Sequence, residues 1–369
     1  MQLLDSASKP PSAPAHSLLE TLQDIADHIQ IQSNFCIHHP HYKPLELPAE
    51  VIDRFKNLPT DLQHKYLSLQ LQSFLYGVYY NGSLRSALTL KTEKNDGSFK
   101  GNLENNTFLG IDLEFYDRLH QSNDGKGYFD PGWRVLRQEE DGSLAVTKGT
   151  LILHILRERH LQPADQGATV SEIVSIRMPK NLMQNGFYVA VGNAGSEHKH
   201  RTGEKSVTVR VYFHLTPDGA IAVMANLTRH LNQANIPFTF KVLYNPSDYK
   251  RYDSGVLYFE RSDYPHVQPI LQQVYAKTSM HFQPQVPLFT KPLAAGLAVA
   301  EEPDQKFADR ESFGMNRCQM IAHGLLQAWQ QGEVAPDRRL HSILQTFTSL
   351  GIDLDRPFLN ANSEDIYTL

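Results

Sequence analysis

The pattern of hydrophobic and polar positions changes character near residue 125. Before that point, apolar side chains recur at helical spacing in three stretches, around 18–29, 61–80 and 108–119. Residues 1–16 are instead rich in Ser, Pro and Ala, a composition typical of a flexible tail. The sequence therefore predicts a flexible N-terminal tail over 1–16 and a mainly helical N-terminal domain over 17–124.

Beyond residue 125, short apolar runs separated by turn signals predict strands: WRVLRQ, LAVTK, TVSEIVSIRM, GFYVAVG, SVTVRVYFHL, FTFKVL and GVLYFE. The run TLILHILRER fits either a strand or a buried helix. Helices are expected to start near Thr216 and Asp263 and to span 312–330 and 336–350. Together these elements predict an α+β domain over 125–369, with a mixed or antiparallel sheet flanked by helices.

The strand SVTVRVYFHL carries two different faces, because side chains alternate across a sheet. One face is apolar, and the other presents Arg210, Tyr212 and His214. A face with these three residue types is equipped to hold an anion and to move a proton. The strand taken alone favours a plainer interpretation, a solvent-exposed face of an antiparallel sheet.

Lys241 lies in the middle of the predicted strand FTFKVL, between aromatic and aliphatic neighbours. A lysine on a central strand is rarely fully buried without a partner. Nearby cations or desolvation would favour its neutral amine and make it a base at neutral pH. An edge-strand lysine that discourages aggregation explains the same pattern equally well.

Three further cations are candidates for binding an anion. Arg251 lies in a loop dense in Tyr and Asp, where a local pair with Asp253 or Asp248 is the plainer alternative. Arg317 falls near the start of a helix that Ser312 is expected to cap, at the end where the helix dipole favours anions. Lys291 is a further candidate of lower weight.

Charge and composition narrow the classes of function. The 35 Lys and Arg against 40 Asp and Glu give a net charge of −5, which argues against a nucleic-acid partner. It leaves room for one phosphate in a local cationic pocket. The sequence has no run of about 18 apolar residues and no apolar signal peptide, so we expect a cytoplasmic protein without membrane contact.

Several motifs that carry chemistry elsewhere are incomplete. The loop GNAG lacks the spacing of a nucleotide-binding motif, and no GxSxG sequence is present. The segment from Cys36 to His41 offers metal-ligand residue types but no second cluster at zinc-site spacing, so we expect a turn with ordinary histidines. The loop EHKHRTGEK is expected to be solvated.

Three blocks resemble the HopA-type effector-like family: NIPFTFKVLYNPSDYKRYDSGVLYFE, PLFTKPLAAGLAVAEEPD and SFGMNRCQMIAHGLLQAW. The likeness covers roughly 151–367, and the helical N-terminal part is similar to the cyanobacterial members of the family. The family includes a type III secretion effector of plant pathogens and the lyase subunit of class V lanthipeptide synthetases. There, a separate kinase-like subunit phosphorylates a ribosomal precursor peptide. The lyase then eliminates the phosphate to leave dehydroalanine or dehydrobutyrine.

The chain also resembles, more weakly, the phosphothreonine lyase effectors. These have a Lys-x-His strand end, a lysine base on a later strand, an arginine before a further strand and a distant arginine. His214, Lys241, Arg251 and Arg317 follow that order. Tyr212 stands where those effectors have the lysine before the histidine, and Arg210 on the same face is the candidate for the missing cation.

The two resemblances imply a role for each candidate. Lys241 would take the Cα proton, and His214 would protonate or stabilise the departing phosphate. The phosphate would be held by Arg210, Arg251 and Arg317. Accessory roles, such as polarising the substrate carbonyl, would fall to Tyr212, Tyr258 and Lys291. No metal or organic cofactor is required.

Two other functions remain open on the sequence. The α+β domain could be a non-catalytic module that binds a phosphopeptide or another partner. It could also be an effector that performs the same elimination on host phosphoproteins. The leading interpretation is a phosphoserine/phosphothreonine lyase whose partners are a phosphorylated precursor peptide and a separate kinase-like subunit.

Overall fold

The computed structural model describes residues 18–90, 110–196 and 207–369. The expected tail over 1–16 and the loop EHKHRTGEK lie outside these ranges. The N-terminal part holds α1 (Leu18–His28), β1 (Gln30–Ile31), β2 (Ile37–His39), β3 (Tyr42–Leu45), α2 (Ala49–Lys56), α3 (Thr60–Leu75), the π-helix η1 (Tyr76–Tyr80), α4 (Arg85–Leu88) and α5 (Leu113–Ser122). It is mainly helical, with a small antiparallel sheet formed by β1, β2 and β3.

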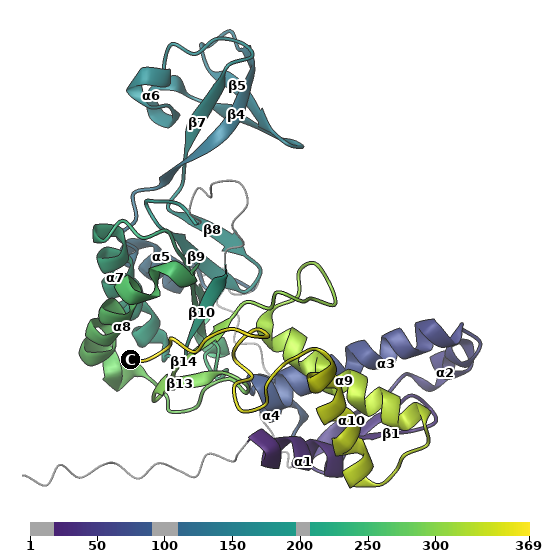
Figure 1. Ribbon diagram of the computed structural model, residues 1–369. Helices are drawn as coiled ribbons and strands as arrows, with labels where there is room; N and C mark the ends of the chain where they lie inside the picture. Colours follow the sequence, from purple (N-terminus) through teal and green to yellow (C-terminus); the bar gives the residue numbers. More distant parts are fainter. Residues whose placement is uncertain (1–17, 91–109, 197–206) are drawn as a thin grey trace, which may run out of the picture.

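The rest of the chain alternates strands and helices (Figure 1). The strands are β4 (Tyr128–Gln138), β5 (Leu144–Lys148), β6 (Leu151–Ile155), β7 (Ile173–Met178), β8 (Asn181–Gln184), β9 (Phe187–Val191), β10 (Thr208–Phe213), β11 (Thr239–Leu243), β12 (Gly255–Glu260), β13 (Lys291–Ala294) and β14 (Leu297–Glu301). The helices are α6 (Arg157–His160), α7 (Pro217–Gln233), α8 (Tyr264–Thr278), α9 (Phe313–Gln330) and α10 (Pro336–Ser349). Single 3₁₀ turns are η3 (Pro163–Asp165), η4 (Pro246–Asp248), η5 (Arg261–Asp263) and η6 (Ser279–His281).

The centre of the fold is a seven-stranded sheet with the order β13-β14-β10-β12-β11-β9-β8. Every neighbouring pair in it is antiparallel. Helices α7 and α8 pack against each other on one side of it, and α5 contacts α7 (Figure 1). The predicted α+β class, with an antiparallel sheet flanked by helices and helices in the N-terminal part, is confirmed.

Alternation along the central strands separates a buried apolar face from a polar one. Val211, Phe213, Phe240 and Leu257 are at most 1% exposed and belong to the main core with the inward side of α7 and α8. Phe213 packs edge-on against Phe240 across the sheet, with ring centres 5.3 Å apart. Because these residues take the apolar face, the intervening positions of the same strands lie on the opposite face, and they include Arg210, Lys241 and Tyr258 of the predicted set.

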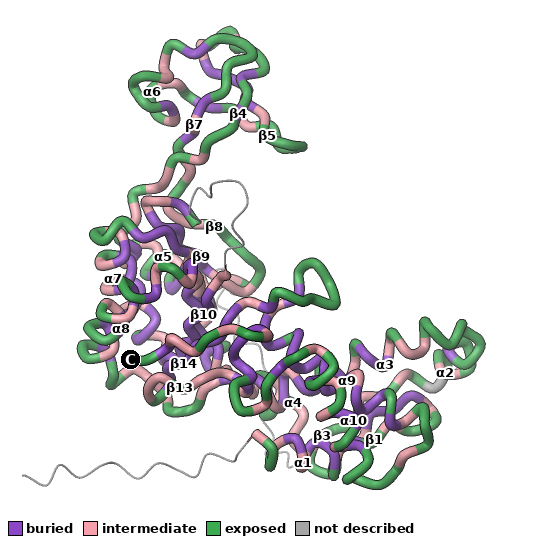
Figure 2. Tube along the Cα trace, in the orientation of Figure 1, coloured by how far each residue is buried: buried purple, intermediate pink, exposed green. Residues whose placement is uncertain are grey.

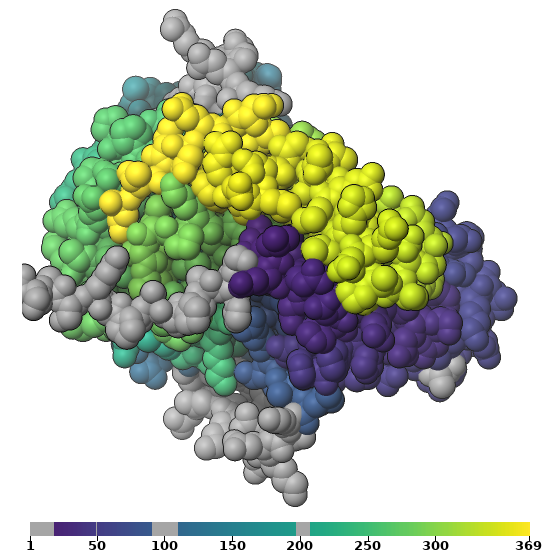
Figure 3. All heavy atoms as spheres, turned by 60° about the horizontal axis from the view of Figure 1, so that its bottom comes forward, coloured from purple at the N-terminus to yellow at the C-terminus, as the bar shows by residue number. Residues whose placement is uncertain are grey.

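The C-terminal helices do not lie on the sheet but return to the N-terminal helices. Helix α9 packs along α3, and α10 packs against both α9 and α1. Figure 3 shows these C-terminal helices directly beside the N-terminal ones. One helical unit is therefore built from both ends of the chain.

The strands β6, β5, β4 and β7 form a separate four-stranded sheet with its own small core around Trp133, Leu144 and Val174. Figure 2 shows it projecting from the rest of the molecule, with exposed surface on most of its length. The run that fitted either a strand or a helix divides into β6 and the short α6. The division of the chain at residue 124 stays a prediction.

Two helix starts illustrate how local chemistry sets the boundaries. The expected helix at 108–119 begins instead at Leu113, because the Asp112 side chain accepts a hydrogen bond of 2.9 Å from the Phe115 backbone. At α7, Thr216 caps the helix as expected, because its hydroxyl accepts a hydrogen bond from the Gly219 backbone N–H.

Among the described residues, no helix combines the length and the apolar character needed to span a bilayer.

Candidate active site

A pocket of about 350 Å³ lies on the polar face of the seven-stranded sheet, beside the segment that leads into α9. Its lining residues come from the central strands and from that segment: Gln184, Val189, Arg210, Thr239, Lys241, Tyr258, Glu302, Lys306, Arg310, Glu311 and Ser312. Four of them are cations and two are carboxylates. We call this site the cationic pocket.

Strand register brings the sheet-borne residues of the cationic pocket together. Arg210 on β10 lies opposite Tyr258 on β12, and Tyr258 lies opposite Thr239 on β11. Lys241 follows Thr239 by two positions and therefore points to the same face. Residues almost fifty positions apart in the sequence thus become neighbours on one surface.

The ring of Tyr258 contacts both cations of the sheet. The Arg210 guanidinium carbon lies 5.0 Å from its centre, and Lys241 Nζ lies 5.3 Å from it. Both distances fall within the range of cation–π attraction. Tyr258 therefore fixes the spacing of the two charged groups.

Lys241 is also held by a second ring. Its Nζ lies 4.7 Å from the centre of Phe187, and the guanidinium carbon of Arg251 lies 5.6 Å from the same ring. Within the described residues, Lys241 Nζ makes no hydrogen bond and no ion pair. The amine is therefore positioned by aromatic contacts and keeps its hydrogen-bonding capacity for a ligand.

Glu302 places a carboxylate inside the cationic pocket. It pairs with the side chain of Arg210 and, at 2.6 Å, with Lys306. Burial alone would raise the pKa of Glu302, but Arg210 and Lys306 outweigh that effect and hold the pKa below its usual value. The cationic pocket thus already stabilises an anionic oxygen.

The segment from Glu302 to Ser312 forms the other wall and ends at the start of α9. The Glu311 carboxylate accepts hydrogen bonds of 2.9 Å from the Phe307 backbone and from Asn316 Nδ2. Ser312 caps α9, its hydroxyl accepting from the Met315 backbone at 3.3 Å. Because Ser312 lines the cationic pocket, the positive end of an 18-residue helix adds to its potential.

A buried polar layer centred on Asp253 lies beside the cationic pocket. The Asp253 carboxylate accepts two bonds from Arg251, at 2.5 and 2.8 Å, and further bonds from Tyr76 and Asn81 at 3.2 Å. Burial favours the neutral acid, but Arg251 outweighs it, so the pKa of Asp253 is lowered. Arg251 thus makes the local pair that the loop sequence allowed, and does not itself line the cationic pocket.

His214 is 2% exposed and lies outside the lining of the cationic pocket. Its Nδ1 lies 3.0 Å from the Gln285 carbonyl, which only accepts, so Nδ1 carries the proton. Its Nε2 is buried without a hydrogen-bond partner in the described part of the chain. Burial lowers the pKa of His214 and so favours the neutral ring, in which Nε2 has no proton to give.

The structure places the remaining predicted residues elsewhere. Arg317 is 1% exposed and donates to the Pro357 and Leu359 carbonyls at 2.9 Å, and to Asn316 Oδ1 at 2.7 Å. It thereby ties the C-terminal segment to α9. Lys291, the first residue of β13, forms an ion pair of 2.5 Å with Asp365 of the C-terminal segment. Tyr212 is buried, and its hydroxyl makes no hydrogen bond to any described residue.

Of the predicted set, the cationic pocket therefore brings together Arg210, Lys241 and Tyr258. Sequence reasoning missed Glu302, Lys306 and Arg310. The available signal was the place of Lys306 and Arg310 directly before a helix cap, although the same run, EEPDQKFADRES, also carries five carboxylates. Such a position favours anion binding, and Arg310 is exposed and makes no ion pair within the described ranges.

Within the segment from Cys36 to His41, the side chain of His39 joins a hydrogen-bond network. His39 Nδ1 accepts from the His41 backbone at 3.1 Å, so the proton of the neutral ring lies on Nε2, 2.9 Å from the Tyr79 hydroxyl. Tyr79 in turn donates to Asp24 at 2.8 Å. Asp24, His28 and His39 approach one another closely enough to hold a cation, but this tautomer occupies Nε2 of His39 with a proton. The expectation of ordinary histidines stays a prediction.

Residues 178–359 match the model of the HopA1 effector protein family. The HopA-type resemblance is confirmed. The HopA1 match includes every residue that lines the cationic pocket and excludes the N-terminal helices and most of the four-stranded sheet.

Among solved structures, the chain is similar to the effector protein of Pseudomonas syringae pv. tomato strain DC3000, with 20% identity and a TM-score of 0.39. It is also similar to that of Pseudomonas syringae pv. syringae strain 61, with 14% identity and a TM-score of 0.38. Each comparison covers 68% of this chain and 81% of the other. No curated protein matches this chain.

Proposed function

We propose that this protein is a phosphoserine/phosphothreonine lyase that eliminates phosphate from a kinase-modified ribosomal precursor peptide. The observation that carries the proposal is the cationic pocket, where Lys241 and Arg210 contact one ring, that of Tyr258. A lyase of this kind needs an anion clamp, a base for the Cα proton and support for the departing phosphate. The residues of the cationic pocket can supply each of these.

The phosphate dianion would occupy the position that the Glu302 carboxylate now takes. Arg210 and Lys306 already bind carboxylate oxygens there, and Arg310 and the start of α9 add positive charge. The Glu302 side chain would move away, so that the phosphate dianion replaces its singly charged carboxylate beside Arg210 and Lys306. The volume of about 350 Å³ is sufficient for a phosphorylated side chain.

Lys241 would act as the general base in its uncharged form. Its amine accepts the Cα proton, and the electrons of the Cα–H bond form the Cα=Cβ bond. The Cβ–O bond breaks, and the phosphate departs with the electron pair of that Cβ–O bond. The products are inorganic phosphate and dehydroalanine from phosphoserine or dehydrobutyrine from phosphothreonine. The Tyr258 hydroxyl, whose ring contacts both Lys241 and Arg210, would donate a hydrogen bond to the reacting atoms.

His214 and Arg251 would have positioning roles in this scheme rather than direct contact with the substrate. Arg251 shares the Phe187 ring with Lys241 and is anchored by Asp253. His214 lies in the same buried layer with its basic Nε2 free. Arg317 would support the start of α9 and would not bind the phosphate.

The experiment is incubation of the protein with a phosphothreonine peptide, followed by mass spectrometry. We expect loss of the mass of phosphoric acid and a new alkene that reacts with thiols. Lys241→Ala should abolish this loss. Lys250→Ala, an exposed lysine in a nearby loop, is the matched control and should retain it. Full elimination by Lys241→Ala would overturn the assignment of the base.

A non-catalytic phosphopeptide-binding module is the second candidate. It is favoured by one observation, that His214 lies outside the lining of the cationic pocket and has no proton on its free nitrogen. In that case the same peptide would bind with an affinity that depends on Arg210 but would keep its phosphate on long incubation. Elimination in that assay excludes the binding-only function.

A further inference from the structure

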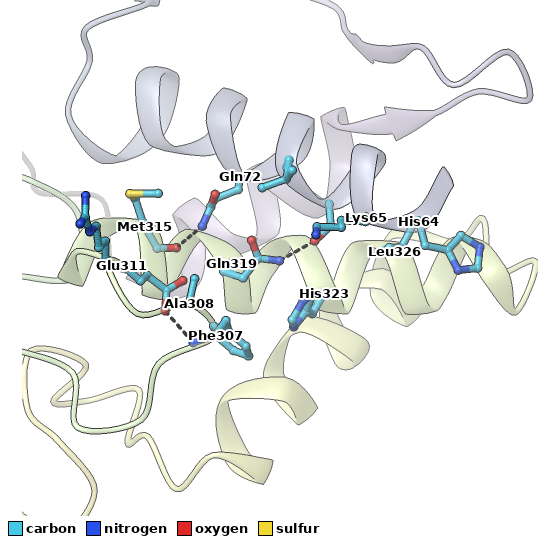
Figure 4. Close-up of a pocket in the computed structure, with 13 residues that line it drawn as sticks. His64, Lys65, Gln72, Phe307, Ala308, Glu311, Met315, Gln319, His323 and Leu326 are labelled. Atoms are coloured by element: carbon cyan, nitrogen blue, oxygen red, sulfur yellow. Dashed lines mark hydrogen bonds between the residues drawn. The ribbon is translucent and has the colours of Figure 1, made fainter. Parts of the chain in front are cut away.

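A second cavity lies next to the cationic pocket, between α3 and α9. Its volume is about 600 Å³, and Figure 4 shows side chains of the two helices facing each other across it. His64, Lys65, Leu69 and Gln72 come from α3, and Met315, Gln319, His323 and Leu326 come from α9. Phe307 and Ala308, from the segment before α9, also line it. We call this cavity the α3–α9 groove.

The spacing of the two walls of the groove is fixed by hydrogen bonds between α3 and α9. Gln72 Nε2 donates to the Met315 carbonyl at 3.1 Å, and Gln319 Nε2 donates to the Ser68 hydroxyl. The ring of Phe307 packs edge-on against His323, with centres 4.8 Å apart. These contacts hold both helices and the segment around Phe307 in place.

Large apolar side chains are nevertheless left exposed in the groove. Leu69 is 53% exposed, Phe307 42% and Met315 38%. Contiguous exposed apolar surface of this kind marks interaction sites. The wall of α9 from Met315 to Leu326 is about 16 Å long at the helical rise. An extended segment of about five residues spans that length.

The α3–α9 groove is continuous with the cationic pocket. Arg310 and Glu311 line both cavities. Glu302 and Lys306 line only the cationic pocket, while Phe307 and Ala308 line only the groove. A chain whose phosphate lies in the cationic pocket therefore reaches the groove by crossing Arg310.

We infer that the α3–α9 groove binds an apolar segment of the substrate peptide next to the phosphorylated residue. This inference rests on the proposed function. The rim of the groove supports the same occupant, since His64, Lys65 and Arg310 present basic groups to a chain that carries a phosphate. The Glu311 carboxylate is already satisfied by the Phe307 backbone and by Asn316. Substrates would accordingly be selected by apolar residues beside the phosphosite.

The test compares three substrates: a phosphothreonine peptide with leucine- and isoleucine-rich flanks, the same peptide with glycine and serine flanks, and a capped phosphothreonine without flanks. We expect the apolar flanks to raise kcat/KM about tenfold over the polar ones, mainly through KM. Equal kcat/KM for the two peptides would overturn the inference.

A matched pair of variants locates the effect. Leu69→Arg places a charge in the groove, whereas Leu62→Arg changes an equally exposed leucine of α3 that does not line it. Leu69→Arg should remove the preference for apolar flanks, and Leu62→Arg should keep it. If the groove docks the kinase-like subunit instead, Leu69→Arg keeps the preference as well, and the inference fails.

Fluorescence anisotropy measures the binding of fluorescently labelled forms of the two flanked peptides. Read together with the elimination assay, it separates this inference from the proposed function. Tighter binding of the apolar-flanked peptide that Leu69→Arg abolishes, without any elimination, supports the groove and overturns the lyase activity. Elimination without any flank preference supports the lyase activity and overturns the groove.

Discussion

The amine of Lys241 lies 5.3 Å from the centre of the Tyr258 ring, on the face of the sheet where Arg210 contacts the same ring. This geometry places a potential base beside a cation already engaged with a carboxylate, that of Glu302. The sheet register that produces it is antiparallel across β10, β12 and β11. The register of these strands is strongly specified, because a shift of β11 by one residue would turn Lys241 to the apolar face of the sheet.

The first prediction separates the basicity of Lys241 from its charge. Lys241→Arg keeps a cation near Tyr258 and Phe187 but cannot lose its proton at neutral pH. We expect it to bind a phosphothreonine peptide with an affinity close to that of the native protein. Elimination should fall by about 10²–10⁴-fold, the usual contribution of a general base. Single-turnover kinetics and a binding titration check the two halves. A variant that eliminates at the native rate would contradict the role.

A second prediction concerns the carboxylate inside the cationic pocket. Glu302→Gln removes the charge that now neutralises Arg210 and Lys306. Because an entering phosphate would no longer compete with a carboxylate, we expect its affinity to rise about tenfold. Calorimetric titration with inorganic phosphate measures this change. Glu333→Gln, at a half-buried glutamate outside the cationic pocket, is the control and should leave the affinity unchanged. Weaker phosphate binding by Glu302→Gln would show that Glu302 organises the cations.

Local patterns were enough to predict much of the sheet. The strand GVLYFE corresponds to β12 at Gly255–Glu260, since alternation and a starting glycine mark both its faces and its boundary. Alternation likewise separates Arg210 and Lys241 from the apolar side chains that precede and follow each of them in its own strand. What alternation cannot give is strand order, which decides that these two residues share the Tyr258 ring.

The differences between the predicted set and the residues of the cationic pocket arise from contacts distant in the sequence and from a segment without a pattern. Arg317 resembles an anion ligand by its position near a helix start, but a segment forty residues later returns to take its hydrogen bonds. Lys306 and Arg310 lie in a segment without periodicity, where no pattern indicates direction. The packing of α9 along α3 joins segments about 250 residues apart, and the α3–α9 groove exists only through it.

The third prediction follows from the buried position of Arg317. Arg317→Leu leaves the carbonyls of Pro357 and Leu359 without donors in a buried site. Each unsatisfied group costs about 1–3 kcal/mol, so we expect a clear loss in the free energy of unfolding. Urea denaturation measures it. Phosphate affinity, titrated on the fraction that remains folded, should be close to native. A selective loss of phosphate binding with unchanged stability would restore Arg317 to the phosphate clamp.

The last prediction concerns acid stability and the network around His39. Burial, followed by the nearby His28, lowers the pKa of His39 to about 4, whereas an unfolded chain has a histidine pKa of about 6.5. Between these values the unfolded state binds a proton that the folded state excludes. The free energy of unfolding should therefore fall as the pH drops from about 6.5 to about 4, by at most about 1.4 kcal/mol per pH unit for this group. Urea denaturation at a series of pH values measures the slope.

His39→Gln should show a shallower slope over the same range, and His154→Gln, at an exposed histidine of β6, should show the native slope. An unchanged slope in His39→Gln would contradict the role of His39, because the remaining dependence would then belong to other groups such as His214, whose pKa burial also lowers.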